Sequence, residues 1–436
     1  MNYDTIKLLN LEQFNTHYQK LETIKIDNTL YCHLTLEQSE TACPTCASIN
    51  HYIHDYRTKK LKHSISTNNP CFIVYKARRY KCRDCGCVFY EPNPFSLKND
   101  KSSNYTIFAV LNSLRSHTVT FTEVAGLFNL TKTSVIRIFD QYVICSRKTL
   151  PGIICFDEVY TSRKSYQKYA FVMVDFFTSE VIEVFSSRHK YRLSQSFSMI
   201  KAEERQKVEY IIIDMWETYL DLAETYFYHA KIAIDSFHVI QQLNNAMIAV
   251  RLKIMRKYDK RTKSVASNDM YYYMLKKFHY FFIKDYNRIY EGPIKIFKIQ
   301  TKWLKSEIRK YLLSIDDDLR EAYFLKEKYR EFNLTADFEN CDEEFETIIF
   351  EFVNSKLEEF RAFGRLLKRW KPYIKNSFIR INGKRLSNGP VEGVVSRIKT
   401  IMKNANGYVN FGRLRNRIMF SLNKNMPIQG MPRKNL

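Results

Sequence analysis

Two pairs of cysteines with the same spacing constrain the N-terminal part of this chain more than any other feature. Cys43-Pro-Thr-Cys46 and Cys82-Arg-Asp-Cys85 are both CxxC sequences, and 35 residues separate them. A CxxC turn places two thiolates on one side of an ion, and structural zinc takes four such ligands in a tetrahedron. We therefore expect residues 1–95 to form a zinc ribbon-like domain in which Zn²⁺ has a structural role.

The same segment contains other residues that bind zinc in proteins, so the ligand set stays open at this point. The spare thiols and imidazoles are Cys71, Cys87, His51, His54 and His63. A different interpretation is two pairs of buried or redox-active cysteines. Because the start of the chain, MNYDTIKLLNLEQF, is not typical of a secretion signal, metal is favoured over disulfides.

The net charge points to nucleic acid. The chain has 69 lysines and arginines against 46 acidic residues, a formal charge of +23. A field of this size attracts polyanions, and double-stranded DNA is the expected partner, although a basic solubility surface is the alternative. No stretch approaches the roughly 18 apolar residues that a membrane helix needs. We expect an intracellular protein with no membrane partner.

Residues 96–148 are expected to form a helix-turn-helix domain. In TFTEVAGLFNLTKTSVIRIFDQYV, an apolar helix over 121–127 leads into a short turn at 128–130. A second helix then begins with Thr131 as its candidate N-cap. Two helices joined in this way are typical of a module that reads DNA.

From Pro151 the pattern changes to that of strands. The runs ICFDEVY, KYAFVMVDFF, EVIEVFSS, VEYIIIDMW and KIAIDSFHVI are rich in β-branched and aromatic residues. Helical patterns, LSQSFSMIKAEERQK and ETYLDLAETYF, precede and follow the fourth run. This order predicts an α/β sheet domain over 149–240, completed by 386–425 and interrupted by a helical insertion over 241–385. The aromatic residues of the insertion are interpreted mainly as core, with stacking on DNA as the alternative.

Acidic residues stand where two of these strands end. Asp157 lies at the end of the first strand and Asp214 at the end of the fourth. These strands are neighbours in an RNase-H-like sheet, so their carboxylates would meet at one edge. Mg²⁺ prefers oxygen ligands and binds phosphate at the same time. Two such ions (or Mn²⁺), about 3.5–4 Å apart, would activate the attacking oxygen and stabilise the leaving one.

A third acid is expected from a later helix. In SNGPVEGVVSRIKTIMK, Asn388 or Gly389 can cap a helix that has Pro390 in its first turn. Glu392 then shares one helix face with Lys399 and Lys403, because these residues recur at helical spacing. The carboxylate can hold metal while the lysines bind DNA phosphates.

Each acid also has a structural interpretation. An aspartate after an apolar run is commonly a turn residue, and Glu392 could simply close a capping box. Asp235, after the fifth strand, is the alternative to Asp214, which the strand order favours. His238 could be a supporting group, a general base or a core histidine, and we expect supporting roles for it and for Asp235. Glu158 lies on the opposite side of the first strand and is interpreted as structural.

Taken in order, these segments resemble the ISL-three family of bacterial insertion-sequence transposases, within the DDE group. The resemblance covers nearly the whole chain and rests on CPTC, RRYKCRDCGCVF, the helix-turn-helix, FDEV, IIIDMWETY, IDSFHVIQQLNNAMIAVR and SNGPVEGVVSRIKTIMKNANGYVNFGRLRNRI. It implies a multidomain α+β protein: a zinc-binding domain, a helix-turn-helix, and an RNase-H-like catalytic domain with a large helical insertion. The DDE acids fall on Asp157, Asp214 and Glu392, and Lys399 matches a basic residue often found after the glutamate.

This chain departs from the family at one place. Relatives have paired acidic residues followed by small ones, whereas residues 157–160 here read DEVY. The first metal site stays usable, but its surroundings differ.

The resemblance implies a DNA transposase that binds the terminal inverted repeats of an insertion sequence, then cuts and joins DNA. The recognition helix, about 131–142, is expected to enter a major groove, and zinc-domain residues to contact the DNA backbone. A homodimer on DNA is expected because two element ends must be brought together. The resemblance also implies a cytoplasmic protein associated with the bacterial nucleoid. The candidate DNA contacts are Arg78, Arg79, Lys81, Arg83, Thr131, Lys132, Ser134, Arg137, Arg397 and Lys403.

Two other functions fit parts of the sequence. One is a zinc-containing helix-turn-helix regulator whose sheet domain is inactive, which would bind DNA without cutting it. The other is a repair or junction nuclease with the same metal site, which would cut without joining. The presence of all three acids argues against the regulator.

Overall fold

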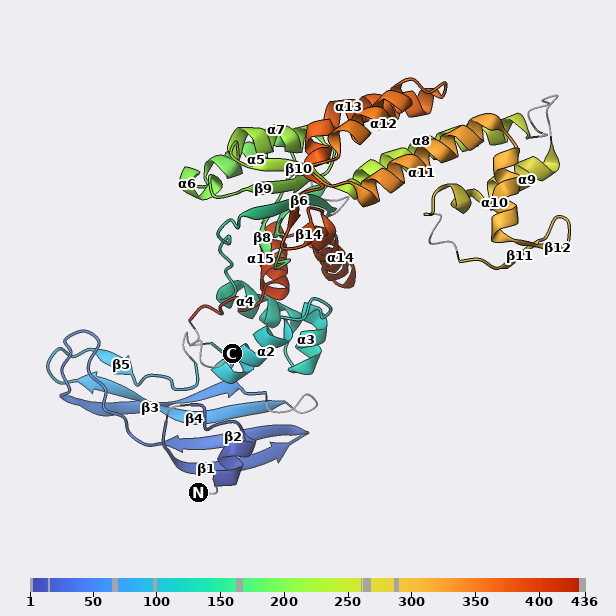
Figure 1. Cartoon of the computed structure of the whole chain (residues 1–436). Helices are drawn as coiled ribbons and strands as arrows, with labels where there is room; N and C mark the ends of the chain where they lie inside the picture. The colour runs from blue at the N-terminus through green and yellow to red at the C-terminus, as the bar shows by residue number, and fades with distance from the viewer. Residues whose placement is uncertain are drawn as a thin grey trace. The chain divides into compact units, whose positions relative to one another are not determined.

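The computed structural model describes residues 3–14, 16–64, 70–96, 100–161, 168–259, 261, 268–285 and 290–430. The chain forms two compact units, whose elements are drawn in Figure 1. The first unit comprises Met1–Lys148, Val159–Ala170 and Val394–Leu436, and the second comprises Thr149–Glu158 and Phe171–Gly393. Each unit is therefore built from segments that are distant in the sequence.

A twisted sheet with strand order β1-β2-β4-β3, and with β5 beside β4, forms the first part of the first unit. Its elements are α1 (Tyr3–Leu8), β1 (Tyr18–Ile26), β2 (Thr29–Leu36), β3 (His51–Lys62), β4 (Cys71–Cys82) and β5 (Val88–Tyr90). Along the first half of β4 buried and half-buried residues alternate, which is the period of a strand with one face on a core. Leu34, Ile73 and Tyr75 belong to that core.

Helices form the second part of the first unit. They are α2 (Asn104–Ser113), α3 (Phe121–Leu127), α4 (Lys132–Tyr142), α15 (Phe411–Leu422) and most of α14 (Gly389–Asn404). Thr120 and Glu123 form a capping box at the start of α3. Thr131 caps α4 by accepting a hydrogen bond from the backbone N–H of Ser134 at 3.2 Å. The predicted pair of helices with a turn at 128–130 is present, and Thr131 is the N-cap of the second helix, α4.

Helix α15 completes this helical part although it comes from the far end of the chain. Arg417 is only 1% exposed, and its guanidinium donates to the carbonyl oxygens of Leu114, Ser116 and Val119. Buried charged groups are stable when they are fully hydrogen-bonded, and three carbonyl oxygens provide that here. Arg413 adds a bidentate ion pair with Asp140 of α4.

A five-stranded sheet with order β10-β9-β6-β7-β8 forms the centre of the second unit. Its elements, in chain order, are β6 (Ile153–Tyr160), β7 (Tyr169–Asp175), β8 (Val181–Phe185), α5 (Lys190–Ser198), α6 (Ala202–Arg205), β9 (Tyr210–Ile213), α7 (Glu217–Tyr226) and β10 (Lys231–Ile234). Strands β6, β9 and β10 run parallel, and β7 and β8 are antiparallel. The predicted neighbours, the first and fourth strands, are thus paired.

A long helical segment follows β10. It contains α8 (Ser236–Lys257), α9 (Asp269–Lys277), η2 (His279–Phe282), β11 (Pro293–Ile296), β12 (Thr301–Leu304), α10 (Lys305–Ser314), α11 (Asp317–Thr335), α12 (Asp342–Val353), α13 (Glu358–Asn376), β13 (Arg380–Ile381) and β14 (Lys384–Arg385). Helices α8 and α11 lie side by side (Figure 1). Phe278, Phe281 and Phe282 are buried in the core of the unit, in agreement with the core interpretation of these aromatic residues.

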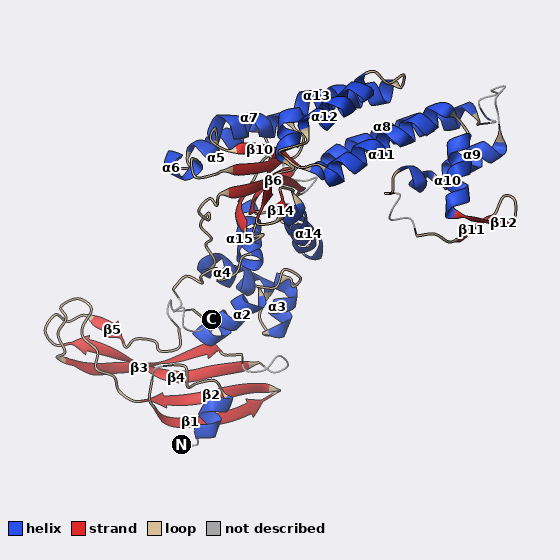
Figure 2. Cartoon of the chain, viewed as in Figure 1, coloured by secondary structure: helices blue, strands red, loops and turns tan. Residues whose placement is uncertain are grey.

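The structure differs from the sequence expectation in two details. The segment expected as one helix, LSQSFSMIKAEERQK, is broken into α5 and α6, and buried Ile200 lies at the break. The insertion also contains an antiparallel hairpin, β11–β12, among the helices, as the red strands of Figure 2 show. Within the described ranges, no helix is both long and apolar enough to cross a membrane.

Helices α12 and α13 approach each other closely at Gly364. A Cβ atom built there would lie 2.7 Å from the backbone nitrogen of Val353 and 2.9 Å from the carbonyl carbon of Phe352. We predict that Gly364→Ala lowers the free energy of unfolding by about 1–3 kcal/mol, because backbone atoms must move apart. Gly126→Ala is the control, since nothing lies within 4 Å of its Cβ position in α3. Equal effects of the two substitutions in denaturant unfolding would contradict the prediction.

Candidate functional site

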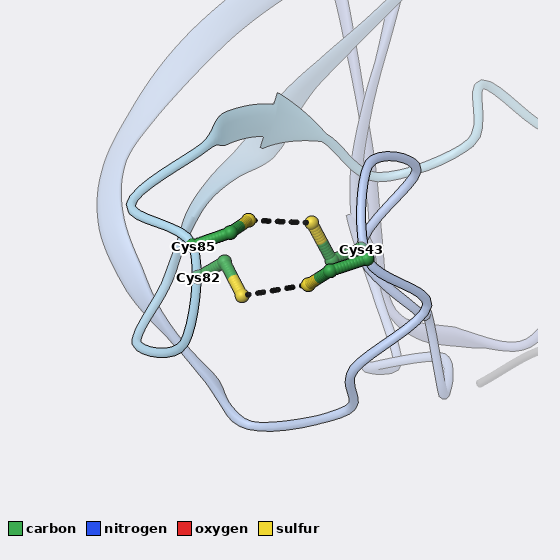
Figure 3. A group of neighbouring side chains, drawn as sticks. Cys43, Cys82 and Cys85 are labelled. Carbon is green, nitrogen blue, oxygen red and sulfur yellow. Dashed lines mark hydrogen bonds between the residues drawn. The ribbon is translucent and has the colours of Figure 1, made fainter.

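The four CxxC cysteines meet at one point of the first unit. The Sγ atoms of Cys43 and Cys85 are 3.5 Å apart, and those of Cys46 and Cys82 are 3.6 Å apart (Figure 3). All four sulfur atoms lie within 4.8 Å of one another. Tetrahedral zinc with Zn–S bonds of about 2.3 Å would hold its sulfur atoms about 3.8 Å apart, whereas a disulfide needs about 2.05 Å. The arrangement fits zinc and not two disulfides.

The two CxxC turns have the same backbone geometry. The N–H of Cys43 donates to the carbonyl of Ser48, and the N–H of Cys82 donates to that of Cys87. The residue four positions after each first cysteine, Ala47 or Gly86, has a positive φ of 57° or 73°. Each turn therefore presents its thiols in the same way, which is the arrangement expected of paired zinc knuckles.

Hydrogen bonds prepare one of the four thiols, that of Cys43, for ionisation. The pKa of Cys43 is lowered to about 6. Burial raises it, but the N–H groups of Cys46 and Thr45 and the thiols of Cys85 and Cys46 stabilise the thiolate and outweigh burial. A thiolate is the form that binds metal.

The spare thiols, those of Cys71 and Cys87, lie outside the four-cysteine cluster. Cys71 is buried in the sheet core, with its Sγ 3.8 Å from that of Cys32 on β2. Cys87 accepts a hydrogen bond from the hydroxyl of Thr45 at 3.2 Å.

The histidines of the zinc domain also have other partners. His63 is buried and is hydrogen-bonded to Ser103 at 2.8 Å and to the carbonyl of Leu9. The ring of His51 stacks on Tyr80, with ring centres 4.5 Å apart. The ligand set that the sequence left open therefore narrows to the four cysteines among the described residues.

Three aspartates lie side by side at one edge of the second unit's sheet. Strand pairing matches Cys155 with Ile212, and Ile213 with Ile234. Continuing this register by two positions from the first pair and by one from the second brings Asp157, Asp214 and Asp235 next to one another. Asp214 and Asp235 directly follow β9 and β10, whereas Asp157 lies within β6, because that strand extends three residues further than the sequence predicted. Two short apolar runs that each end in Asp, YIIID and KIAID, were the signal for this row in the sequence.

The crowding of these carboxylates changes their acidity. The pKa of Asp157 is raised to about 7, first by burial and then by the negative charge of Asp214. The pKa of Asp235 is also raised, mainly by burial and further by the charges of Asp214 and Glu392, although a hydrogen bond from Asn388 and the charge of His238 oppose the rise. A cation bound between these carboxylates would lower their pKa values again, because an opposite charge nearby favours the ionised form.

His238, in the first turn of α8, contacts the row directly. Its Nε2 lies 3.0 Å from Oδ1 of Asp214. Burial lowers the pKa of His238, but the bond to Asp214 and the charges of Asp214, Asp235 and Asp157 outweigh burial and raise it. Asp214, Asp235 and His238 have ligand atoms within 4.8 Å of one another and could hold a metal ion.

Asn388 is a residue of this site whose role the sequence did not indicate beyond a helix cap. It is 2% exposed, and its Nδ2 donates to Oδ1 of Asp214 and to the carbonyl of Phe156, both at 3.1 Å. Its backbone N–H donates to Oδ1 of Asp235 at 3.0 Å. A buried asparagine between two strand ends gives no periodic pattern, so only the three-dimensional structure could identify it.

Glu392 lies one turn further along, on α14. Its charge contributes to the raised pKa of Asp235, which places the two carboxylates within electrostatic range. Ser396, Lys399 and Lys403 are exposed, as is Glu392, so the predicted common helix face is present. The structure thus brings Asp214, Asp235, His238 and the start of α14 together.

Glu158 points away from the other acids, as expected. Its carboxylate forms an ion pair with Arg188 and accepts a hydrogen bond from the hydroxyl of Tyr219 at 3.1 Å.

One candidate DNA contact requires correction. Arg78 is only 9% exposed, and its guanidinium binds Glu91 at 3.0 Å and the carbonyl oxygens of Leu36 and Glu37. Its donors are engaged inside the protein, so its role is structural. Strand β4 alternates between two faces, and the run of basic residues concealed which of them face inward.

The other basic candidates of the zinc domain are more accessible. Arg79 is half-buried and pairs with Asp55 at 3.0 Å, and Lys81 is half-buried. Arg83 is exposed, with its guanidinium 5.0 Å from the ring centre of Tyr52.

The candidates on the two helices differ in exposure. On α4, Thr131, Lys132 and Arg137 are exposed and Ser134 is half-buried; on α14, Lys403 is exposed and Arg397 is half-buried.

Comparison with known proteins gives two family matches. Residues 154–418, more than half of the chain, match the family model of ISL3-type DDE transposases, described as transposase. Residues 39–85 match the zinc-finger of transposase IS204/IS1001/IS1096/IS1165, and this segment contains all four clustered cysteines. Among curated proteins, none matches the chain. The chain belongs to the ISL3 family of transposases and carries that family's N-terminal zinc ribbon.

Proposed function

We propose that this transposase binds the terminal inverted repeats of an insertion sequence and performs metal-dependent DNA cleavage and strand transfer in an RNase-H-like domain. The observation that carries the proposal is the row of three carboxylates, one within β6 and one directly after each of the parallel strands β9 and β10, with Glu392 on the adjoining helix. Asp157, Asp214 and Glu392 are proposed as the catalytic acids. Asp235 and His238 are proposed as supporting residues.

The residues of the site fit divalent cations. The donors are carboxylate oxygens, which Mg²⁺ and Mn²⁺ prefer. Oδ2 of Asp235 is buried and has no hydrogen-bond partner within the described part of the chain. Burial and the charge of Asp214 raise the pKa of Asp157, and a bound cation would stabilise its ionised form. Two divalent cations at this site would activate the attacking oxygen and stabilise the leaving one.

The protein's own groups have separate tasks in this proposal. The three acids hold the cations and fix their positions. His238 and Asn388 orient Asp214 through hydrogen bonds to the same oxygen, Oδ1. Lys399, seven residues after Glu392, binds a DNA phosphate. In-line attack by water and then by a DNA 3′-hydroxyl needs no covalent bond between protein and DNA.

DNA recognition is proposed for the first unit. The pair α3 and α4 would act as a helix-turn-helix, with Lys132 and Arg137 on its exposed surface. From Gly393 to Leu436 the chain has nine lysines and arginines and no acidic residue. Such a segment favours a polyanionic partner. A dimer on DNA follows from the need to hold two element ends.

The catalytic assignment predicts selective losses of activity. Asp157→Asn, Asp214→Asn and Glu392→Gln should each reduce Mg²⁺-dependent cleavage and strand transfer by roughly a thousandfold or more, because a charged ligand is lost. Asp235→Asn should weaken activity less. Asp221→Asn is the control, since Asp221 forms only a surface ion pair with Lys190. DNA carrying the element's own ends is the substrate.

Two results would argue against this function. Full activity of Asp157→Asn would remove the proposed acid triad. Tight binding of the element ends by wild type, with no cleavage at any metal concentration, would instead identify a DNA-binding regulator.

The zinc assignment predicts one tightly bound zinc per chain, measured by elemental analysis of the purified protein. Cys46→Ser should lose that zinc and destabilise the first unit, because structural zinc contributes folding free energy directly. Cys87→Ser should retain it, since Cys87 lies in the same turn region but outside the cluster. Equal zinc content in both variants would refute this ligand set.

The raised pKa of Asp157 predicts that the site destabilises the protein without added magnesium or manganese. Its folded-state pKa of about 7 exceeds the ordinary value of 3.8, so stability falls as pH rises between these values. Asp157→Asn cannot ionise and keeps an acceptor for the N–H of Glu158. It should be more stable than wild type at pH 8 by about 1–3 kcal/mol, allowing for screening by water.

The gain should shrink steadily on acidification and disappear near pH 4. Denaturant unfolding at several pH values, with the zinc cluster loaded, measures it. A pH-independent difference between the two proteins would show that the carboxyl charge is not responsible.

A further inference from the structure

Asn388 connects the four segments that carry the proposed catalytic acids and Asp235. Its side-chain amide donates hydrogen bonds to the carbonyl oxygen of Phe156, the residue before Asp157, and to the carboxylate of Asp214. Its backbone N–H holds Asp235. Its own carbonyl accepts the N–H groups of Val391 and Glu392 at 3.0 and 3.1 Å. One residue therefore contacts β6, the residues following β9 and β10, and the first turn of α14.

The direction of the amide follows from its partners. A carboxylate and a carbonyl oxygen are both acceptors, so the nitrogen of the amide must face them, and rotating the amide would place oxygen against oxygen. Oδ1 of Asn388 is buried and has no hydrogen-bond partner within the described ranges. An asparagine at the start of a helix ordinarily uses this oxygen to cap the helix. Here the side-chain amide instead donates hydrogen bonds to Phe156 and Asp214.

These hydrogen bonds fix one carboxylate oxygen of Asp214 and one of Asp235. Oδ1 of Asp214 accepts from Asn388 and from His238, and Oδ1 of Asp235 accepts from the backbone of Asn388. Oδ2 of Asp235 stays buried and unpaired in the described structure. Carboxylates that are held in one orientation lose less freedom when they bind a cation, and partners of metal ligands commonly change metal affinity by about 10–100-fold.

We propose that Asn388 is a positioning residue that sets the spacing between Glu392 and the strand-end aspartates, and thereby the affinity of the site for divalent cations. The inference rests on the proposed function, in which these carboxylates hold the catalytic cations. Without the amide, the start of α14 and the carboxylate of Asp214 lose their common attachment, and the repelling acids move apart.

The test uses the full-length, zinc-loaded protein and Mn²⁺ as the probe. The first variant is Asn388→Ser, because serine still favours the start of a helix but is too short to reach Asp214; Asn388→Ala is the second. Asn376→Ala is the matched control. Its amide also donates to a backbone carbonyl, that of Ile232 at 2.7 Å, but contacts none of the proposed ligands.

Two quantities are measured for each protein: the rise in unfolding temperature during a Mn²⁺ titration without DNA, and the Mn²⁺ dependence of DNA cleavage. Both Asn388 variants should need about 10–100-fold more Mn²⁺ in each measurement, and saturating Mn²⁺ should restore much of the cleavage rate. Asn376→Ala should match wild type in its Mn²⁺ dependence, even if it unfolds at a lower temperature.

The outcomes separate the two proposals. If wild type and both Asn388 variants share one Mn²⁺ dependence, the positioning role is wrong and the proposed function stands. If wild type neither binds Mn²⁺ at this site nor cleaves DNA, the proposed function itself fails. Equal losses in Asn376→Ala and Asn388→Ser would show a general effect of destabilisation and would also overturn the positioning role.

Discussion

The backbone pairing of β6, β9 and β10 places Asp157, Asp214 and Asp235 beside one another, and their repulsion is the constraint that the rest of the site must satisfy. Parallel strands end at the same edge, so apolar runs of matched length bring the residues that follow them into a row. His238 and Asn388 supply hydrogen-bond donors to this row. The buried strands resist separation, so the fold holds the acids together although their charges oppose it.

Much of this arrangement followed from local patterns. Strand periodicity located β6 and β9, and the strand order of an RNase-H-like sheet predicted that they pair. Helical spacing predicted the exposed face that carries Glu392. The CxxC spacing predicted the cysteine cluster, because chemistry rather than folding detail selects its ligands. The assignment of Asp157, Asp214 and Glu392 as catalytic stays a prediction.

Other features depend on contacts between distant residues and left no local trace. Asn388 looked like a helix cap, and its amide serves strands that end more than 150 residues earlier. Arg78 looked like part of a basic surface, and its burial depends on Glu91 and on the loop before β3. Arg417 resembled its basic neighbours in sequence, Arg413 and Arg415, which are only half-buried. In each case the role of the residue depends on its hydrogen-bond partners, and a periodic pattern in the sequence does not predict which residues those are.

The position of α15 has a consequence for how the protein is made. The carbonyl oxygens of Leu114, Ser116 and Val119 receive their donor from Arg417, which follows them by 303, 301 and 298 residues. The ribosome therefore synthesises the whole second unit before it adds that arginine. The helices that follow the zinc domain stay incomplete until then, and a chain terminated before Arg417 lacks them in finished form. Maturation of the first unit thus waits for synthesis of the second.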